Sequence, residues 1–249
     1  MKTRTIVSNI LKYLILLSVI GYLGFALAKI IRPVGEVVCT GVELQFDDEG
    51  EENVLIGEEG IRAILTAHKI TPQGQMFGTI DFKEIDSILS LNPYIDTVTS
   101  YNNSAGKLCV RIKRLCPILH IFSDSGEEFY LARTGKTMVQ GGLNTNLCVV
   151  TGNVSRAYAS KHLVTLGRFL CDDSYWKLQA QQVNITKDGE IQVIPRVGDC
   201  VIELGPPIDI DKKLQNARIF YEKGFTATGW NKYKAISVAF KDQVVCTKR

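Results

Sequence analysis

An uncharged apolar stretch lies close to the amino terminus, over Tyr13–Ala28. If Lys12 extends toward the lipid headgroups, a helix over Ile10–Ala28 is roughly 28 Å long at a rise of about 1.5 Å per residue, close to the ~30 Å hydrocarbon core of a bilayer. We therefore expect one membrane-spanning helix over residues 10–32, after a short tail over residues 1–9. The rest of the chain has the composition of an ordinary soluble protein.

A cleaved secretory signal is the alternative interpretation of this segment. Basic residues precede it, and Ala26-Leu27-Ala28 has the small-x-small form of a cleavage site. Against cleavage, Phe25 and Leu27 keep the segment apolar to its end, and Lys29 and Arg32 resemble the interfacial end of an anchor. Basic residues are more numerous before the segment than directly after it, so the positive-inside rule predicts a cytoplasmic tail and an exported remainder.

The overall composition limits the class of protein. Hydrophobic residues make up 45% and charged residues 22% of the 249 residues, which is enough apolar material for packed cores without a metal or disulfides. The net charge of +3 is small and gives no support to nucleic-acid binding. We expect neither nucleic acid nor a small-molecule substrate among the ligands.

The cysteines form no C-x-x-C pair, so the sequence predicts neither a redox motif nor a zinc ribbon. Most of them lie in apolar alternating runs, where a cysteine serves as a small buried hydrophobe. An oxidising compartment would still permit a disulfide between any two that come close, and because their number is odd, at least one stays unpaired within the chain. The seven are Cys39, Cys109, Cys116, Cys148, Cys171, Cys200 and Cys246.

The first part of the exported chain predicts a small α+β layer. Asp81 is well placed to cap a helix, and Glu84 stands three residues later, at the capping-box position. The order strand, helix, helix, strand, strand predicts two helices on one face of a three-stranded sheet. The expected elements are a strand over 36–46, a helix around 61–65, a helix over 82–91 and a hairpin of strands over 94–100 and 107–114.

The second half predicts a β-domain of consecutive antiparallel strands with two helices. Short alternating runs are separated by turn sequences such as Asp-Ser-Gly and Lys-Asp-Gly. The expected strands are 117–122, 128–131, 148–154, 181–186, 190–195, 201–204, 235–240 and 243–246, and the expected helices are 158–170 and 210–223, the second opened by Asp209.

Catalytic constellations are missing from the sequence. His68, His120 and His162 do not form an H-E-x-x-H motif, and we interpret each as a surface or structural histidine. Thr134-Gly135-Lys136-Thr137 imitates the end of a phosphate loop, but Tyr130 stands where the first glycine is required. We predict no catalytic, cofactor-binding or metal-binding site and no enzyme activity; an anchored hydrolase with an unrecognised site is the alternative from the enzyme class.

An ordered series of short motifs carries a family resemblance over nearly the whole chain. Together they resemble the FtsQ (DivIB) family of bacterial cell-division proteins, in the form found in Bacteroidetes-type bacteria. The motifs are Ile80-Asp81-Phe82, Leu91-Asn92-Pro93-Tyr94-Ile95, Arg111-Ile112-Lys113-Arg114, Pro117-Ile118, Phe129-Tyr130-Leu131, Val149-Val150-Thr151-Gly152 and Gln243-Val244-Val245-Cys246. Ala132 and Val139 depart from the acidic residue and the proline that the family pattern leads us to expect.

The resemblance implies a POTRA domain over residues 33–114 and an FtsQ-type β-domain over residues 115–249. It further implies a non-enzymatic divisome scaffold required for septum formation, held by a single anchor in the bacterial inner membrane at the division septum. Its expected partners are the FtsB and FtsL proteins, through which it couples early and late division proteins. A POTRA-bearing secretion or outer-membrane assembly factor is the alternative function.

The resemblance assigns partner binding to the last strands of the β-domain. An unpaired strand edge offers a row of N–H and C=O groups that a strand of another protein can complete. The same residues could instead pack within the sheet, because alternation alone does not say which edge remains open. The residues predicted to bind the partner are Ile236, Val238 and Phe240 from the penultimate strand and Gln243, Val244 and Val245 from the last.

Overall fold

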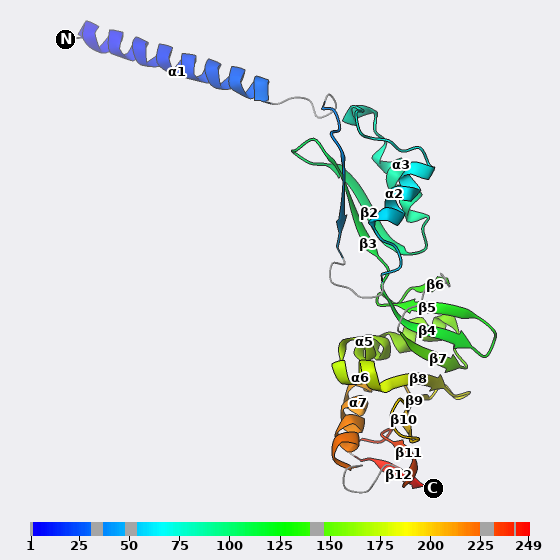
Figure 1. The fold of residues 1–249 in the computed structure, drawn as a ribbon. Helices are drawn as coiled ribbons and strands as arrows, with labels where there is room; N and C mark the ends of the chain where they lie inside the picture. The colour runs from blue at the N-terminus through cyan, green and yellow to red at the C-terminus, as the bar shows by residue number, and fades with distance from the viewer. Residues whose placement is uncertain (1, 31–36, 48–53, 140–146, 225–231, 242) are drawn as a thin grey trace.

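The computed structural model describes residues 2–30, 37–47, 54–139, 147–224, 232–241 and 243–249 (Figure 1). Helix α1 (Lys2–Ile30) extends the helix predicted over residues 10–32 toward the amino terminus. Its side chains from Tyr13 to Phe25, all of them apolar or small, are exposed. Within the described part of the chain, no helix combines the length and the apolar character required of a membrane span.

A small sheet with two helices follows α1, as predicted. In the small sheet the strand order is β1-β3-β2, with β1 parallel and β2 antiparallel to β3. Both helices lie on one face (Figure 1), where Ile61 and Leu89 pack with Val110 in one buried cluster. The elements are β1 (Val42–Phe46), α2 (Glu58–Ala67), the 3-10 turn η2 (Phe77–Thr79), α3 (Phe82–Ser90), β2 (Ile95–Asn102) and β3 (Leu108–Arg114).

The start of α3 confirms the predicted cap. The Asp81 carboxylate accepts hydrogen bonds from the backbone N–H groups of Lys83 at 2.9 Å and Glu84 at 3.1 Å. These donors have no partner within a helix, so the cap fixes the first turn. The apolar positions Ile85 and Leu89 then lie one turn apart on the face that packs against the small sheet.

A large sheet of nine described strands makes up the carboxy-terminal half, in the order β12-β11-β10-β9-β8-β7-β4-β5-β6. Strand β6 was not predicted. The strands are β4 (Pro117–Ser123), β5 (Glu128–Ala132), β6 (Thr137–Val139), β7 (Cys148–Gly152), β8 (Ala180–Ile185), β9 (Ile191–Pro195), β10 (Val201–Gly205), β11 (Tyr233–Ser237) and β12 (Val245–Lys248).

The large sheet is mixed, so the prediction of consecutive antiparallel strands is wrong. Strands β4 and β7, β7 and β8, and β10 and β11 pair in parallel, whereas the other neighbours are antiparallel. For the pairs β7 with β8 and β10 with β11, the physical reason is the position of the helices. One helical segment connects β7 to β8 and another connects β10 to β11, and a crossover of this kind returns the chain to the same end of the sheet.

The helices of this half also differ in detail from the prediction. The expected helix over 158–170 begins earlier and contains a π-turn, and α6 was not expected. The segments are α4 (Arg156–Tyr158), the π-turn η3 (Ala159–Leu163), α5 (Val164–Asp172), α6 (Ser174–Gln179), α7 (Ile210–Ile219) and the π-turn η4 (Phe220–Gly224). Asp209 opens α7 as predicted, since it stands at the N-cap position, but its φ is 52° and its side chain accepts no capping hydrogen bond.

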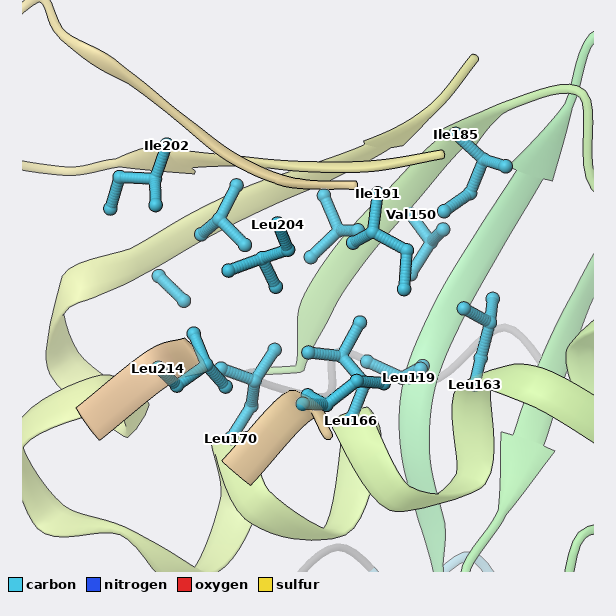
Figure 2. Close-up of a cluster of buried hydrophobic side chains, with 14 of the residues drawn as sticks. Leu119, Val150, Leu163, Leu166, Leu170, Ile185, Ile191, Ile202, Leu204 and Leu214 are labelled. Carbon is cyan, nitrogen blue, oxygen red and sulfur yellow. The ribbon is translucent and has the colours of Figure 1, made fainter. Parts of the chain in front are cut away.

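The main core lies between the large sheet and the helices that cover one of its faces (Figure 2). Leu119 and Val150 from the sheet face Leu166 and Leu170 from α5. Gly167 permits this close approach, because a Cβ atom there would lie 2.8 Å from Ile118 Cδ1. Among the described residues, the opposite face of the large sheet carries no helix (Figure 1).

Candidate partner-binding edge

Strand β12 forms one end of the large sheet. It pairs antiparallel with β11, with Val245 opposite Ser237 and Cys246 opposite Ile236. Strand β11 in turn pairs in parallel with β10, so its backbone is bonded on both sides. Among the described residues, no strand pairs with the outer side of β12. This outer side is therefore the available edge at the carboxy-terminal end of the sheet.

The structure divides the six predicted partner-binding residues into two groups. Ile236 and Val238 lie in the main core and present no surface to another protein. Phe240 is 55% exposed and Val245 is 44% exposed, and Gln243 is also exposed. Val244 is half-buried and packs against the main core. The edge presents the last strand and the turn before it, whereas β11 supports that strand from within.

The turn before β12 follows from the close approach of two backbones. The N–H of Val238 donates to the carbonyl of Glu203 at 2.9 Å, just past the end of β11. Gly205 has a φ of +69°, and a Cβ atom there would lie 2.8 Å from the Cβ of Ala239. Glycine is therefore required at residue 205. The chain leaves the sheet after Val238, whereas the predicted strand continued to Phe240.

A groove runs beside the start of β12. Its volume is about 580 Å³, and it lies between the carboxyl end of α7 with η4 and the residues that lead into β12. Ile219, Phe220 and Val244 provide its apolar lining, and Asn216, Lys223 and Gln243 provide polar groups.

Sequence reasoning missed this groove. Ile219, the last residue of α7, is 52% exposed. The available signal was the width of the apolar surface. Leu214, Ala217, Ile219, Phe220 and Tyr221 cover more of the helix than one buried stripe needs.

Two family models match the chain. The model described as FtsQ/DivIB, C-terminal related, matches residues 116–247, just over half of the chain. The chain belongs to this family. The model described as a POTRA-like domain matches residues 37–113, which contain the small sheet. No curated protein matches the chain.

The FtsQ/DivIB-related membership confirms the predicted family and points to a role in cell division. Proteins of this family are typically non-enzymatic. The bacterial lineage that we inferred from the motifs stays a prediction.

The histidines of this FtsQ/DivIB-related chain lie in three separate elements. His120 Nε2 lies 2.8 Å from Glu128 Oε1, and its ring stacks on Tyr130 with a centroid separation of 4.3 Å. His162 contacts the ring of Tyr158, and His68 Nδ1 lies 3.0 Å from the carbonyl oxygen of Ile64. Over the described residues, no three metal-binding side chains gather in one place.

None of the seven cysteines forms a disulfide within the part of the chain that the structure describes. Burial, reinforced by the nearby Cys171, raises the pKa of the Cys148 thiol to about 12. Burial, reinforced by Cys246, raises the pKa of Cys200 to about 11. These thiols are therefore protonated at neutral pH, and protonated thiols are poor nucleophiles.

Proposed function

We propose that this chain is a non-enzymatic scaffold of the bacterial division machinery, required for septum formation. It binds the division proteins FtsB and FtsL through the β12 edge and couples early to late division proteins. Helix α1 anchors it in the inner membrane at the septum, with the amino terminus in the cytoplasm and the two sheets outside. The proposal extends the family membership to partners, site and location.

The open outer side of β12 is the observation that supports the binding mode. A strand edge with free N–H and C=O groups is completed by an extended segment of another protein, and alternate side chains then give selectivity. The edge lies within residues 116–247, the part of the chain that matches the FtsQ/DivIB-related family. A POTRA-like domain alone is equally compatible with a secretion factor. The match to the FtsQ/DivIB-related family therefore favours a division role.

The exposed apolar surface of α1 supports the anchor. Tyr13, Leu17 and Phe25 are exposed along with the apolar residues between them, and the other described elements leave that surface uncovered. Lipid is the environment that suits such a helix, and the basic residues Lys2, Arg4 and Lys12 favour a cytoplasmic amino terminus.

Site-specific photo-crosslinking in living cells tests the partner and the edge together. A photoreactive residue at Val245 should capture an FtsB- or FtsL-type protein, because this exposed side chain lies on β12. Val139 is the matched control, since it is an exposed valine on β6, the strand at the opposite end of the large sheet. Capture of these proteins from Val139 alone would place the interface on the β6 edge and contradict the proposed site. Capture from neither residue would contradict the proposal as a whole.

Depletion tests the cellular role. Cells that lose the protein should grow into filaments, because septum formation stops while elongation continues. Expression of the wild-type chain from a second copy should restore division. Normal septation after depletion would contradict the proposed function.

A further inference from the structure

We propose that the segment that binds the β12 edge is acidic and amphipathic, with an extended part along β12 and apolar side chains in the groove beside it. The inference rests on the proposed function and specifies the chemistry of the partner at that site. Three features of the edge carry it: the open strand, the groove that continues from it, and the charge around both.

The groove is continuous with the open strand. Gln243 and Val244, which line it, directly precede Val245, the first residue of β12. A segment that pairs with β12 and continues past its start therefore reaches Ile219 and Phe220. The volume of about 580 Å³ lies within the range of roughly 300–1,000 Å³ that is typical of pockets that bury organic groups. The apolar lining selects aliphatic or aromatic side chains.

The charge of this end of the chain selects acidic residues. The last eighteen residues, 232–249, contain five basic residues and one acidic residue, so they carry +4 in a chain whose net charge is +3. Lys234, Lys241 and Lys248 are exposed, and within the described residues none of the three forms an ion pair. Arg249 pairs with Asp199 at 3.2 Å. Opposite charge on the partner is expected to guide association and fix its register.

Binding of the full-length chain in detergent micelles tests the groove. The probe is the purified extracytoplasmic segment of the FtsB-type protein from the same genome. Ile219→Gln should weaken its affinity about tenfold, because the substitution removes apolar surface from the groove. Ile208→Gln is the control, since Ile208 is an equally large side chain that is 63% exposed and lies outside the groove. Ile208→Gln should leave the affinity unchanged.

Charge reversal tests the acidic character of the partner. The double substitution Lys241→Glu with Lys248→Glu should lower the affinity about tenfold, and it should reduce the loss of affinity between about 0.05 M and 0.5 M NaCl. Lys187→Glu, at an exposed turn between β8 and β9, is the control and should change neither quantity. Replacing acidic residues of the probe by lysine should restore binding to the double variant, which a merely unfolded variant could not show.

The possible results separate the inference from the proposed function. Absence of binding by the wild-type chain would overturn both. Binding that Ile219→Gln and the lysine reversals leave unchanged would overturn the inference alone. A concentration-dependent dimer of the chain that Ile219→Gln dissociates would show that a second copy occupies the groove, and it would likewise overturn the inference. Loss of affinity in both groove and charge variants, with both controls unchanged, would support it.

Discussion

Lys136 of the large-sheet unit donates to Asp96 of the small sheet, with 2.5 Å between Nζ and Oδ1. The Asp96 side chain is only 10% exposed, although the Lys136 side chain is largely in solvent. Beside this ion pair, Leu115 and Met138 belong to a small apolar cluster, against which Tyr94 packs. Because only two residues separate β3 from β4, the ion pair and the cluster join the two units directly at their connection.

Loss of this ion pair should destabilise the joint. In Lys136→Met, the shielded Asp96 carboxylate loses its cation, so we expect a decrease of about 1–3 kcal/mol in the free energy of unfolding measured in urea. Lys187→Met removes an exposed lysine that forms no ion pair within the described residues, and it should change stability by less than about 0.5 kcal/mol. Equal effects of the two substitutions would show that the ion pair adds nothing to the free energy of unfolding.

The contact between α5 and β4 should tolerate no side chain at residue 167. In Gly167→Ala the new Cβ would lie 2.8 Å from Ile118 Cδ1 and 2.9 Å from Leu119 Cγ, so both buried neighbours must move. Overpacking of this kind costs about 1–3 kcal/mol, which exceeds the gain of about 1 kcal/mol in helix propensity. Gly41→Ala, where no atom lies within 4 Å of the new Cβ, is the control for urea unfolding. An unchanged midpoint for Gly167→Ala would contradict the packing described.

Stability should fall in alkaline solution because of the buried thiols. Burial raises the pKa of Cys148 from 9.0 to about 12 in the folded chain, so above pH 9 the unfolded chain releases a proton that the folded chain retains. The stabilisation is therefore complete below pH 9 and decreases as the pH rises toward 12, by up to about 1.4 kcal/mol per pH unit for each such thiol.

Cys148→Ala isolates this effect. The variant should show a shallower loss of unfolding free energy between pH 8 and pH 10.5 than the wild-type chain, when both are measured in urea with a reductant present. The same comparison at pH 7 and pH 8 should give parallel curves, because the thiol is protonated in both states there. A wild-type curve parallel to that of the variant over the whole range would contradict the raised pKa.

Much of the local structure could be predicted from the sequence, because local patterns determine it. The Asp81 cap and the alternation in β3 depend on residues a few positions apart, and both elements form where they were predicted. The direction of strand pairing could not be predicted in the same way. The alternation in Cys148–Gly152 indicates a strand, but its parallel partners β4 and β8 are distant in the sequence, and the direction of pairing depends on how the intervening segments return the chain to the sheet.

The candidate site shows the same division between local and long-range information. The sequence predicted a last strand over residues 243–246, and β12 forms two residues later, over Val245–Lys248. It could not show that Ile236 is covered, because Ile236 lies beside Ile202 and Cys246 on two other strands. It could not show the groove either, since the exposure of Ile219 depends on how the end of α7 lies relative to the start of β12.

Substitutions at Ile236 and Val245 should therefore affect different properties: the first should lower stability, and the second should weaken partner binding. Ile236→Ala removes a fully buried side chain and should lower the free energy of unfolding by about 2–5 kcal/mol. Val245→Ala shortens an exposed side chain on the edge strand, so it should change that free energy by less than about 0.5 kcal/mol while reducing capture of the FtsB-type protein. Urea unfolding and crosslinking from Gln243 measure the two effects in the same pair of variants. If Val245→Ala unfolds the chain as readily as Ile236→Ala does, then β12 is part of the core, and its edge is no free surface for a partner.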